Sequence, residues 1–263
     1  MRQAWSEFLR GVPAGRHGVE IYSDERDLTG SVARFLAAGF ERGEPAIVVA
    51  TEPHTLAFRA RLSELGWTED RVGSGLTALD ARATLDGIME SGSPSRERFM
   101  DVVGGLVRRV GNAGEGAGPR VFGEMVDLLS ADGNADAAFA LESLWNELAE
   151  TLPFRLLCGY RLDLFDPECQ TSMLPRVCRE HTHVMPASNY PRFARAVDGA
   201  LREALGPTEA ARVYVQVSRQ SGDDERVPLA ELILMWVSEN MPRRAEGILS
   251  SARRHYTAGS TAR

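Results

Sequence analysis

The sequence predicts an α/β fold with a doubly wound, mainly parallel sheet flanked by helices, and with a C-terminal helical extension. As far as about Tyr160, short apolar segments alternate with longer ones whose apolar residues recur at helical spacing. Strands and helices that alternate in this way form parallel sheets. The 263 residues suffice for one such domain and a smaller appendage. We expect a first domain over residues 1–187 and a helical region over residues 188–263.

Five segments have the apolar character of strands that are buried on both faces of a sheet. They cover residues 17–22, 46–50, 76–80, 120–126 and 154–160. Glu124 stands out in the fourth, since an ionised carboxylate is costly to bury without partners. It is therefore expected either to face a ligand or to be tied to a neighbour such as Arg161.

Helices are expected between and after these strands. They cover residues 24–41, 51–65, 81–90, 96–110, 135–150, 176–183, 188–205, 227–240 and 242–256, with breaks at 206–207 and 221–224. Ser23 and Asp24 can cap the first of them, and Pro242 suits the first turn of the last. A short helix over residues 3–9 and a disordered tail after Tyr256 complete the expectation.

Composition excludes several classes of protein. No run of 18 apolar residues exists, so no membrane span is expected, and the N-terminus lacks the apolar core of a signal peptide. Three cysteines are too few for a disulfide scaffold, which favours a cytoplasmic location. A net charge of −7 argues against general nucleic-acid binding. All 30 basic residues are arginine, which excludes any mechanism that needs a lysine.

The expected ligand site lies beyond the carboxyl ends of the strands, where open α/β sheets bind their ligands. This rule selects Tyr22, Thr51, Asp80, Glu124 and residues 160–163. Tyr22 and Tyr160 offer aromatic rings and hydroxyl groups, and Glu124 offers an acceptor. The alternative is that both tyrosines are packing residues and that Glu124 pairs with an arginine.

A nucleotide is not the expected ligand. The segment after the first strand, residues 22–28, has neither a glycine-rich turn nor a lysine. Asp24, Glu25 and Asp27 would occupy the first helical turn and repel a triphosphate there. A nucleotide-binding or ATPase descendant with a degenerate phosphate loop remains the alternative.

Several side chains could hold a metal ion. They are Cys158, Cys169, Cys178, His181 and His183. Their spacing matches no standard zinc finger, and cysteines are common in protein cores, so packing is the favoured interpretation. A catalytic cysteine–histidine pair lacks a nucleophile turn. We therefore expect no metal, no cofactor and no enzymatic activity.

Eight short patterns occur in order along the chain. They are His17-x4-Tyr22, Phe35–Leu36-x2-Gly39-x3-Gly43–Glu44, Val48–Val49–Ala50–Thr51, Leu79–Asp80, Phe122–Gly123–Glu124–Met125-x2-Leu128–Leu129, Leu141–Glu142-x2-Trp145–Asn146-x-Leu148, Leu156–Leu157–Cys158–Gly159–Tyr160 and Val177–Cys178-x2-His181-x-His183. This ordered set, over about residues 15–185, resembles the MEDS domain, a RecA-like ligand-sensing module of prokaryotic signalling proteins.

The resemblance implies a sensor of small molecules, with simple hydrocarbon derivatives among the ligands proposed for the family. It also implies a partner that is a kinase or a transcription regulator. On the family pattern, His17 and His181 join Tyr22, Glu124 and Tyr160 as ligand-binding residues. An extended strand would hold His17 and Tyr22 about 16 Å apart, however, so both cannot touch one small ligand.

The C-terminal helices are covered by no resemblance. Leu229, Leu232 and Trp236 on one helix either pack on the core or form a surface for a partner, a homodimer included. A pure interaction module that acts through these helices is thus a third hypothesis, beside the sensor and the nucleotide-binding descendant.

Overall fold

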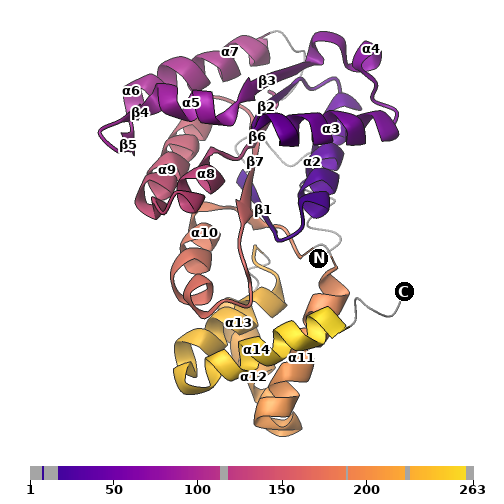
Figure 1. Ribbon diagram of the computed structural model, residues 1–263, viewed down its shortest axis with the longest axis vertical. Helices are drawn as coiled ribbons and strands as arrows, with labels where there is room; N and C mark the ends of the chain where they lie inside the picture. The colour runs from indigo at the N-terminus through magenta and orange to yellow at the C-terminus, as the bar shows by residue number, and fades with distance from the viewer. Residues whose placement is uncertain (1–7, 9–16, 113–117, 188, 223–225, 259–263) are drawn as a thin grey trace. The chain divides into compact units, whose positions relative to one another are not determined.

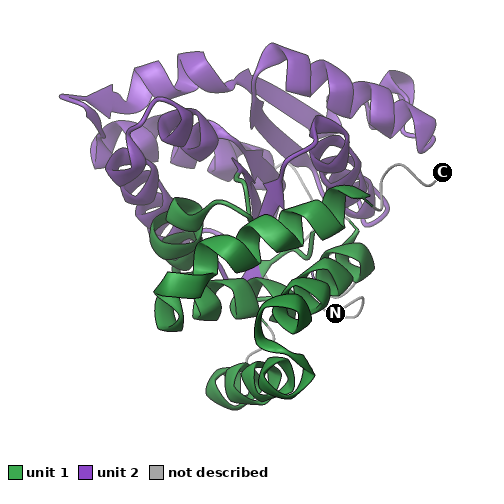
Figure 2. Cartoon of the chain, turned by 60° about the horizontal axis from the view of Figure 1, so that its bottom comes forward, with its two compact units in different colours: residues 1, 162–179, 184–263 green, residues 2–161, 180–183 purple. Residues whose placement is uncertain are grey.

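The computed structural model describes residues 8, 17–112, 118–187, 189–222 and 226–258. They form two compact units (Figure 2). The sheet unit comprises residues 2–161 and 180–183, and the helical unit comprises residues 1, 162–179 and 184–263. The predicted division after residue 187 differs from these units in placing residues 162–179 and 184–187 with the sheet.

The described residues form a six-stranded sheet in the order β3-β2-β6-β7-β1-β8 (Figure 1). Its strands are β1 (His17–Tyr22), β2 (Ala46–Ala50), β3 (Leu76–Asp80), β6 (Arg120–Gly123), β7 (Arg155–Arg161) and β8 (His183–Val184). The pairs that join β3, β2, β6, β7 and β1 are all parallel. Two-residue strands β4 (Met89–Glu90) and β5 (Ser93–Pro94) form a separate antiparallel pair. The predicted parallel α/β architecture is confirmed.

Helices cover both faces of the sheet, as a doubly wound fold requires. They are α2 (Glu25–Phe40), α3 (Glu52–Glu64), α4 (Glu69–Val72), α5 (Ala81–Ile88), α6 (Arg96–Phe99), α7 (Gly105–Asn112), α8 (Met125–Ala131) and α9 (Ala135–Thr151), with a 3-10 turn at Gly73–Gly75 and a π-helical segment at Met100–Gly104. Helices α2 and α3 lie on one face, and α5, α7 and α9 on the other (Figure 1). None of the helices in the described residues is long and apolar enough to cross a membrane.

The fourth strand is shorter than predicted. It ends at Gly123, and Met125 and Val126 begin helix α8, with Glu124 at its N-cap position. The apolar run from Val121 to Val126 does not by itself distinguish a buried strand from the buried face of a helix. Met125, Val126 and Leu129 are that buried face of α8.

The helical unit contains α10 (Leu174–Glu180, whose last residue belongs to the sheet unit), α11 (Tyr190–Leu205), α12 (Pro207–Ser221), α13 (Leu229–Asn240) and α14 (Pro242–Ala258), with a π-helical segment at Cys169–Met173. Pro242 begins the last helix, as predicted, but that helix runs past the expected tail start to Ala258. The remainder of the predicted tail and, apart from Phe8, the helix over residues 3–9 lie outside the described residues.

Helix α12 was missed by the sequence analysis. Gly206, with φ of +78°, ends α11, and Pro207 starts α12 immediately. A glycine–proline pair predicts a break, but proline is also well suited to the first turn of a helix. Ala210, Val213 and Val217 recur at helical spacing and are buried in the core of the helical unit.

A buried ion-pair network joins the amino ends of the two central strands β6 and β7. Glu44 accepts hydrogen bonds from Arg120 Nε at 2.7 Å and from Arg155 Nη1 at 2.9 Å. Arg120 and Arg155 begin β6 and β7 and are direct neighbours in the register. Burial alone would raise the pKa of Glu44, but the hydrogen bond and charge of Arg120 and the charge of Arg155 lower it below its ordinary value.

Gly39 makes room for this network and provides a test of it. A Cβ atom at Gly39 would lie 2.6 Å from Cδ of Arg120, in the middle of a buried and paired side chain. We expect Gly39→Ala to lower the free energy of unfolding by about 1–3 kcal/mol, because the arginine must shift. The measurement is urea denaturation followed by circular dichroism.

Gly30 is the matched control on the same helix. A Cβ atom there meets nothing closer than Arg34 Nη1 at 3.8 Å. Gly30→Ala should therefore raise the free energy of unfolding by up to about 1 kcal/mol, as expected for alanine in a helix. Stabilisation by both substitutions would contradict the tight packing of Arg120.

Candidate functional site

The structure places four of the five predicted site residues in two clusters of the sheet unit, and the fifth, Tyr160, beside one of these clusters. Tyr22 and Glu124 lie at the carboxyl ends of the strands. His17, Tyr160 and His181 lie instead on the face of the sheet that α9 covers. Tyr160 does not join the strand-end residues, because its side chain is fully buried and shares this face with that of Cys158.

The first cluster, called the crest cluster, consists of Tyr22, Glu25, His54, Glu124 and Asp127. Glu124 is 2% exposed, and one of its carboxylate oxygens accepts a hydrogen bond from the backbone N–H of Thr51. Its other oxygen is hydrogen-bonded to His54 Nδ1, and His54 Nε2 is hydrogen-bonded to Glu25. One imidazole thus bridges two carboxylates from different elements.

A second pair completes the crest cluster. The Tyr22 hydroxyl donates to Asp127 Oδ2 at 2.9 Å, and the backbone N–H of Arg161 donates to Asp127 Oδ1 at 2.7 Å. The guanidinium of Arg161 lies 3.4 Å from Glu25. The expectation that Glu124 pairs with an arginine such as Arg161 is therefore wrong: its side-chain partner is His54.

His54 and Asp127 were not predicted as site residues. Each lies three residues after a residue that directly follows a strand, Thr51 or Glu124 respectively. The first turn of the helix that follows each strand was the available signal. It is a weak signal, since polar residues are common in first turns for capping alone.

Electrostatics at the crest cluster fix the protonation of two groups. The hydrogen bond to Glu124, aided by the one to Glu25, raises the pKa of His54 to about 9 against the opposing effect of burial. Burial and the charge of Asp127 raise the pKa of Tyr22 above its ordinary value. At neutral pH the imidazole is therefore cationic and the phenol is neutral, so both donate hydrogen bonds.

The N-terminus of α2 carries its own carboxylates. Asp24 Oδ1 accepts from the backbone N–H of Arg26 at 2.9 Å, and Glu25 and Asp27 lie in the first turn. In a phosphate-binding loop, phosphate oxygens would occupy this position. The structure therefore places the three carboxylates at this helix end, as the sequence predicted.

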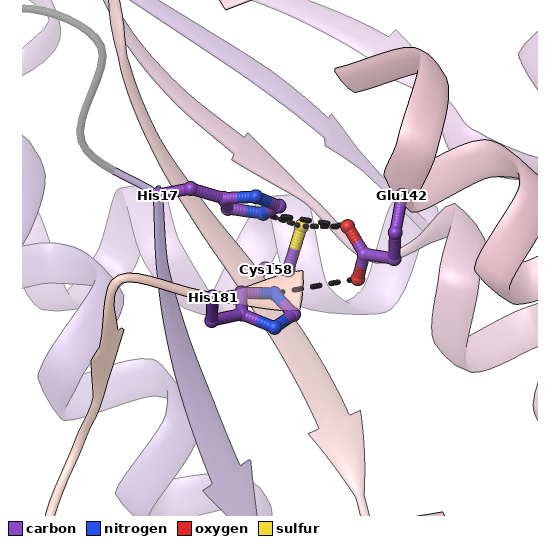
Figure 3. Close-up of side chains that lie close together, drawn as sticks. All are labelled: His17, Glu142, Cys158 and His181. Atoms are coloured by element: carbon purple, nitrogen blue, oxygen red, sulfur yellow. Dashed lines mark hydrogen bonds and ion pairs between the residues drawn. The ribbon is translucent and has the colours of Figure 1, made fainter. Parts of the chain in front are cut away.

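The second cluster, called the buried cluster, consists of His17, Glu142, Cys158 and His181 (Figure 3). His17 Nε2 lies 3.1 Å from Cys158 Sγ and 3.3 Å from Glu142 Oε2, and His181 Nε2 lies 3.4 Å from Glu142 Oε1. All four side chains are buried, and their donor atoms lie within 4.8 Å of one another. They could hold a metal ion.

Four segments supply the buried cluster. His17 begins β1, Cys158 lies in β7, Glu142 projects from α9, and His181 directly follows α10. Burial lowers the pKa of His17 to about 4, with the nearby His181 adding to the effect. Burial and the charge of Glu142 raise the pKa of the Cys158 thiol. Without a further cation, the imidazole of His17 and this thiol are neutral.

Of the five side chains that the sequence suggested as possible metal ligands, only Cys158 and His181 lie in the buried cluster. Cys169 and Cys178 belong to the helical unit, and His183 hydrogen-bonds Thr182. Glu142 was not predicted as a possible metal ligand. The sequence did contain an indication of it, because Glu142 is a charged residue next to Leu141 on the apolar side of a predicted helix.

The raised pKa of His54 predicts a pH-dependent stability. Because the folded-state pKa of about 9 exceeds the ordinary value of 6.5, the stabilisation is fully present below pH 6.5 and is lost as the pH rises through 9. We expect His54→Gln to lower the free energy of unfolding at pH 6 by about 1–2 kcal/mol, after allowance for partial exposure. The loss should shrink between pH 6.5 and 9.5, measured by urea denaturation at each pH.

Arg59→Gln, a change at a partly exposed residue of the same helix, is the matched control and should keep the wild-type profile. Glu20 and Glu231 also titrate in the native protein, each with a pKa raised by burial to about 8. Their contribution is common to all three proteins and cancels in the differences. Parallel pH profiles for wild type and His54→Gln would refute the bridging role of His54.

Comparison with known proteins identifies the family. Residues 16–182 match the family model described as "MEthanogen/methylotroph, DcmR Sensory domain", abbreviated MEDS. A search of curated proteins finds no match. The matched region contains both the crest cluster and the buried cluster, and it covers more than half of the 263 residues. The resemblance found in the sequence is confirmed: the chain belongs to the MEDS family of sensory domains.

Proposed function

We propose that this chain is a cytoplasmic sensor that binds a small molecule at the crest cluster and relays its presence to a kinase or a transcription regulator. The observation that supports this proposal is the bridge from Glu25 through His54 to Glu124. The bridge lies at the strand ends where open α/β sheets bind ligands. It also lies within the region that matches the sensory family.

The bridge suggests how a ligand would produce a signal. Glu25 and His54 stand in the first turns of α2 and α3, and Glu124 precedes the first turn of α8. A ligand that replaces one of these hydrogen bonds would change the relative stability of two arrangements of three helix ends. Such a change is a shift between pre-existing states, and a partner protein can read it.

The chemistry of the crest cluster limits the ligand. A cationic imidazole and a phenol supply donors, and three carboxylates surround them, so a neutral or cationic molecule is favoured over an anion. The ring of Phe58 stacks on His54 with centroids 5.8 Å apart and supplies an apolar wall. A simple hydrocarbon derivative with one polar group fits both features.

A receptor is favoured over an enzyme by the same protonation states. An imidazole held between two carboxylates is protonated at neutral pH and is a poor general base. The Tyr22 hydroxyl, with its raised pKa, is equally unsuited to take up a proton. The nucleotide-binding alternative is disfavoured by the carboxylates at the start of α2.

A cavity in the helical unit is the second candidate for the ligand or a partner. It has a volume of about 560 Å³ and lies against α10, α12 and α13. Its lining includes Cys178, Val217, Leu232 and Trp236. Most of the lining lies beyond residue 182, outside the family match, so we favour the crest cluster.

Thermal shift on the full chain tests the proposal with short alcohols, amines, halogenated hydrocarbons and Mg²⁺–ATP. We expect at least one organic compound to raise Tm, by an amount that corresponds to about 2.7 kcal/mol at one hundred times its Kd. His54→Gln and Tyr22→Phe should abolish that response. Gln220→Trp, which narrows the cavity at an exposed lining position, should retain it.

Three results would count against the crest cluster. A response lost in Gln220→Trp and kept in His54→Gln would assign the ligand to the cavity. Stabilisation by micromolar Mg²⁺–ATP would favour the nucleotide-binding descendant. No response to any compound, with normal signalling by Tyr22→Phe and Glu124→Gln, would leave only the interaction module.

A further inference from the structure

The buried cluster has the spacing of a metal site. In a tetrahedral zinc site, bond lengths of 2.0–2.3 Å place the ligand atoms about 3.3–3.6 Å apart. The contacts of Glu142 with His17, His181 and Cys158 measure 3.3, 3.4 and 3.6 Å. The fourth short contact, from His17 Nε2 to Cys158 Sγ, measures 3.1 Å. Imidazole nitrogen, cysteine sulfur and carboxylate oxygen are all atoms that bind zinc in proteins.

The hydrogen bonds around Asn146 determine which atom of His17 carries its proton. The backbone oxygen of Glu180 can only accept, and it lies 3.2 Å from Asn146 Nδ2. The other amide atom, Oδ1, therefore faces His17 Nδ1 at 2.9 Å, and Nδ1 must donate to it. In a neutral imidazole, Nε2 is then left with a lone pair directed into the buried cluster.

That lone pair creates a conflict that a cation would resolve. Nε2 of His17 and the Glu142 carboxylate oxygen 3.3 Å away are both acceptors, and the Cys158 thiol has one proton to share between them. The other oxygen, Glu142 Oε1, has no hydrogen bond of good geometry within the described residues, although His181 Nε2 lies 3.4 Å away and the Tyr160 hydroxyl is a further donor near this carboxylate. Buried acceptors in this state are costly.

Elsewhere the same chain neutralises a buried carboxylate with guanidinium groups. Glu44, which is also buried, is held by Arg120 and Arg155. Around Glu142 the ion-pair partners are imidazoles, and the neighbouring donors are the Cys158 thiol and the Tyr160 hydroxyl. Imidazole and thiol side chains are the ones that bind borderline and soft divalent metals.

We propose that the buried cluster binds one divalent transition-metal ion, with Zn²⁺ the ion that suits it best. His17 and His181 bind through neutral nitrogens, Glu142 through its carboxylate, and Cys158 through sulfur. As the metal–sulfur bond forms, the thiol proton is released to solvent. The charges of the thiolate and the carboxylate then cancel the charge of the ion, so the loaded site is neutral.

With four protein ligands, the site is closed and therefore structural in kind. It would join β1, β7 and α9 to residues 180–183, the segment that returns to the sheet unit between two stretches of the helical unit. Since none of its ligands belongs to the crest cluster, this inference does not rest on the proposed function.

The test uses the full chain, kept reduced and stripped of metal with a chelator, and titrated with Zn²⁺ or Co²⁺. We expect one equivalent to bind, a rise in Tm with Zn²⁺, and the visible absorption of a tetrahedral Co²⁺–thiolate complex. Cys158→Ser should abolish the thiolate signal, and His17→Gln should weaken binding at least about 100-fold. Asn146→Ala should weaken it about 10–100-fold, because Asn146 orients a ligand.

Cys178→Ser, at another buried cysteine, is the matched control and should bind metal as the wild type does. Absence of stoichiometric binding, or unchanged binding by Cys158→Ser, would overturn the proposal. In case a variant fails to fold, alkylation of the wild type in mild urea provides a second readout. Zn²⁺ should slow modification of Cys158 at least about tenfold more than that of Cys178, and equal slowing would also overturn it.

Discussion

The fold depends on one constraint: a carboxylate buried in a parallel α/β sheet has to be neutralised from within the protein. Four such groups, Glu20, Glu44, Glu124 and Glu142, are each at most 3% exposed. The sheet is covered by helices on both faces, so water cannot provide the missing hydrogen bonds. The partners of these four carboxylates consequently determine which strands and helix ends are held together.

The four carboxylates differ in whether their partners can change protonation state or bind a metal. Glu44 has guanidinium partners, which keep their proton, and Glu20 is held protonated at neutral pH by burial, with a pKa of about 8. Glu124 and Glu142 instead depend on imidazoles, which can gain or lose a proton or bind a metal. The imidazole partners thus distinguish the carboxylates of the two candidate sites from the carboxylates that only hold the fold together.

Much of the fold was predictable because apolar runs and helical periodicity are local properties. The fourth strand was predicted to include Met125, and the helix that begins at Pro207 was not predicted. In both places a local pattern has two meanings, since an apolar run suits a strand or a helix, and a proline can end a helix or begin one. The strand-end rule found Tyr22 and Glu124. It misplaced Tyr160, because the face to which a strand residue points depends on how β7 pairs with β1 and on which helix covers that face.

The family pattern combined residues that the structure separates. His17 and Tyr22 are the first and last residues of β1, and they belong to different clusters. No spacing in the sequence could show that Glu142 meets His17 and His181, because α9 has to cross the sheet at one particular height for the three to touch. Residues that occur together in a family pattern therefore need not share a ligand. In this chain β1 carries one residue of each cluster, so a displacement of the strand along its axis would move a side chain in both clusters.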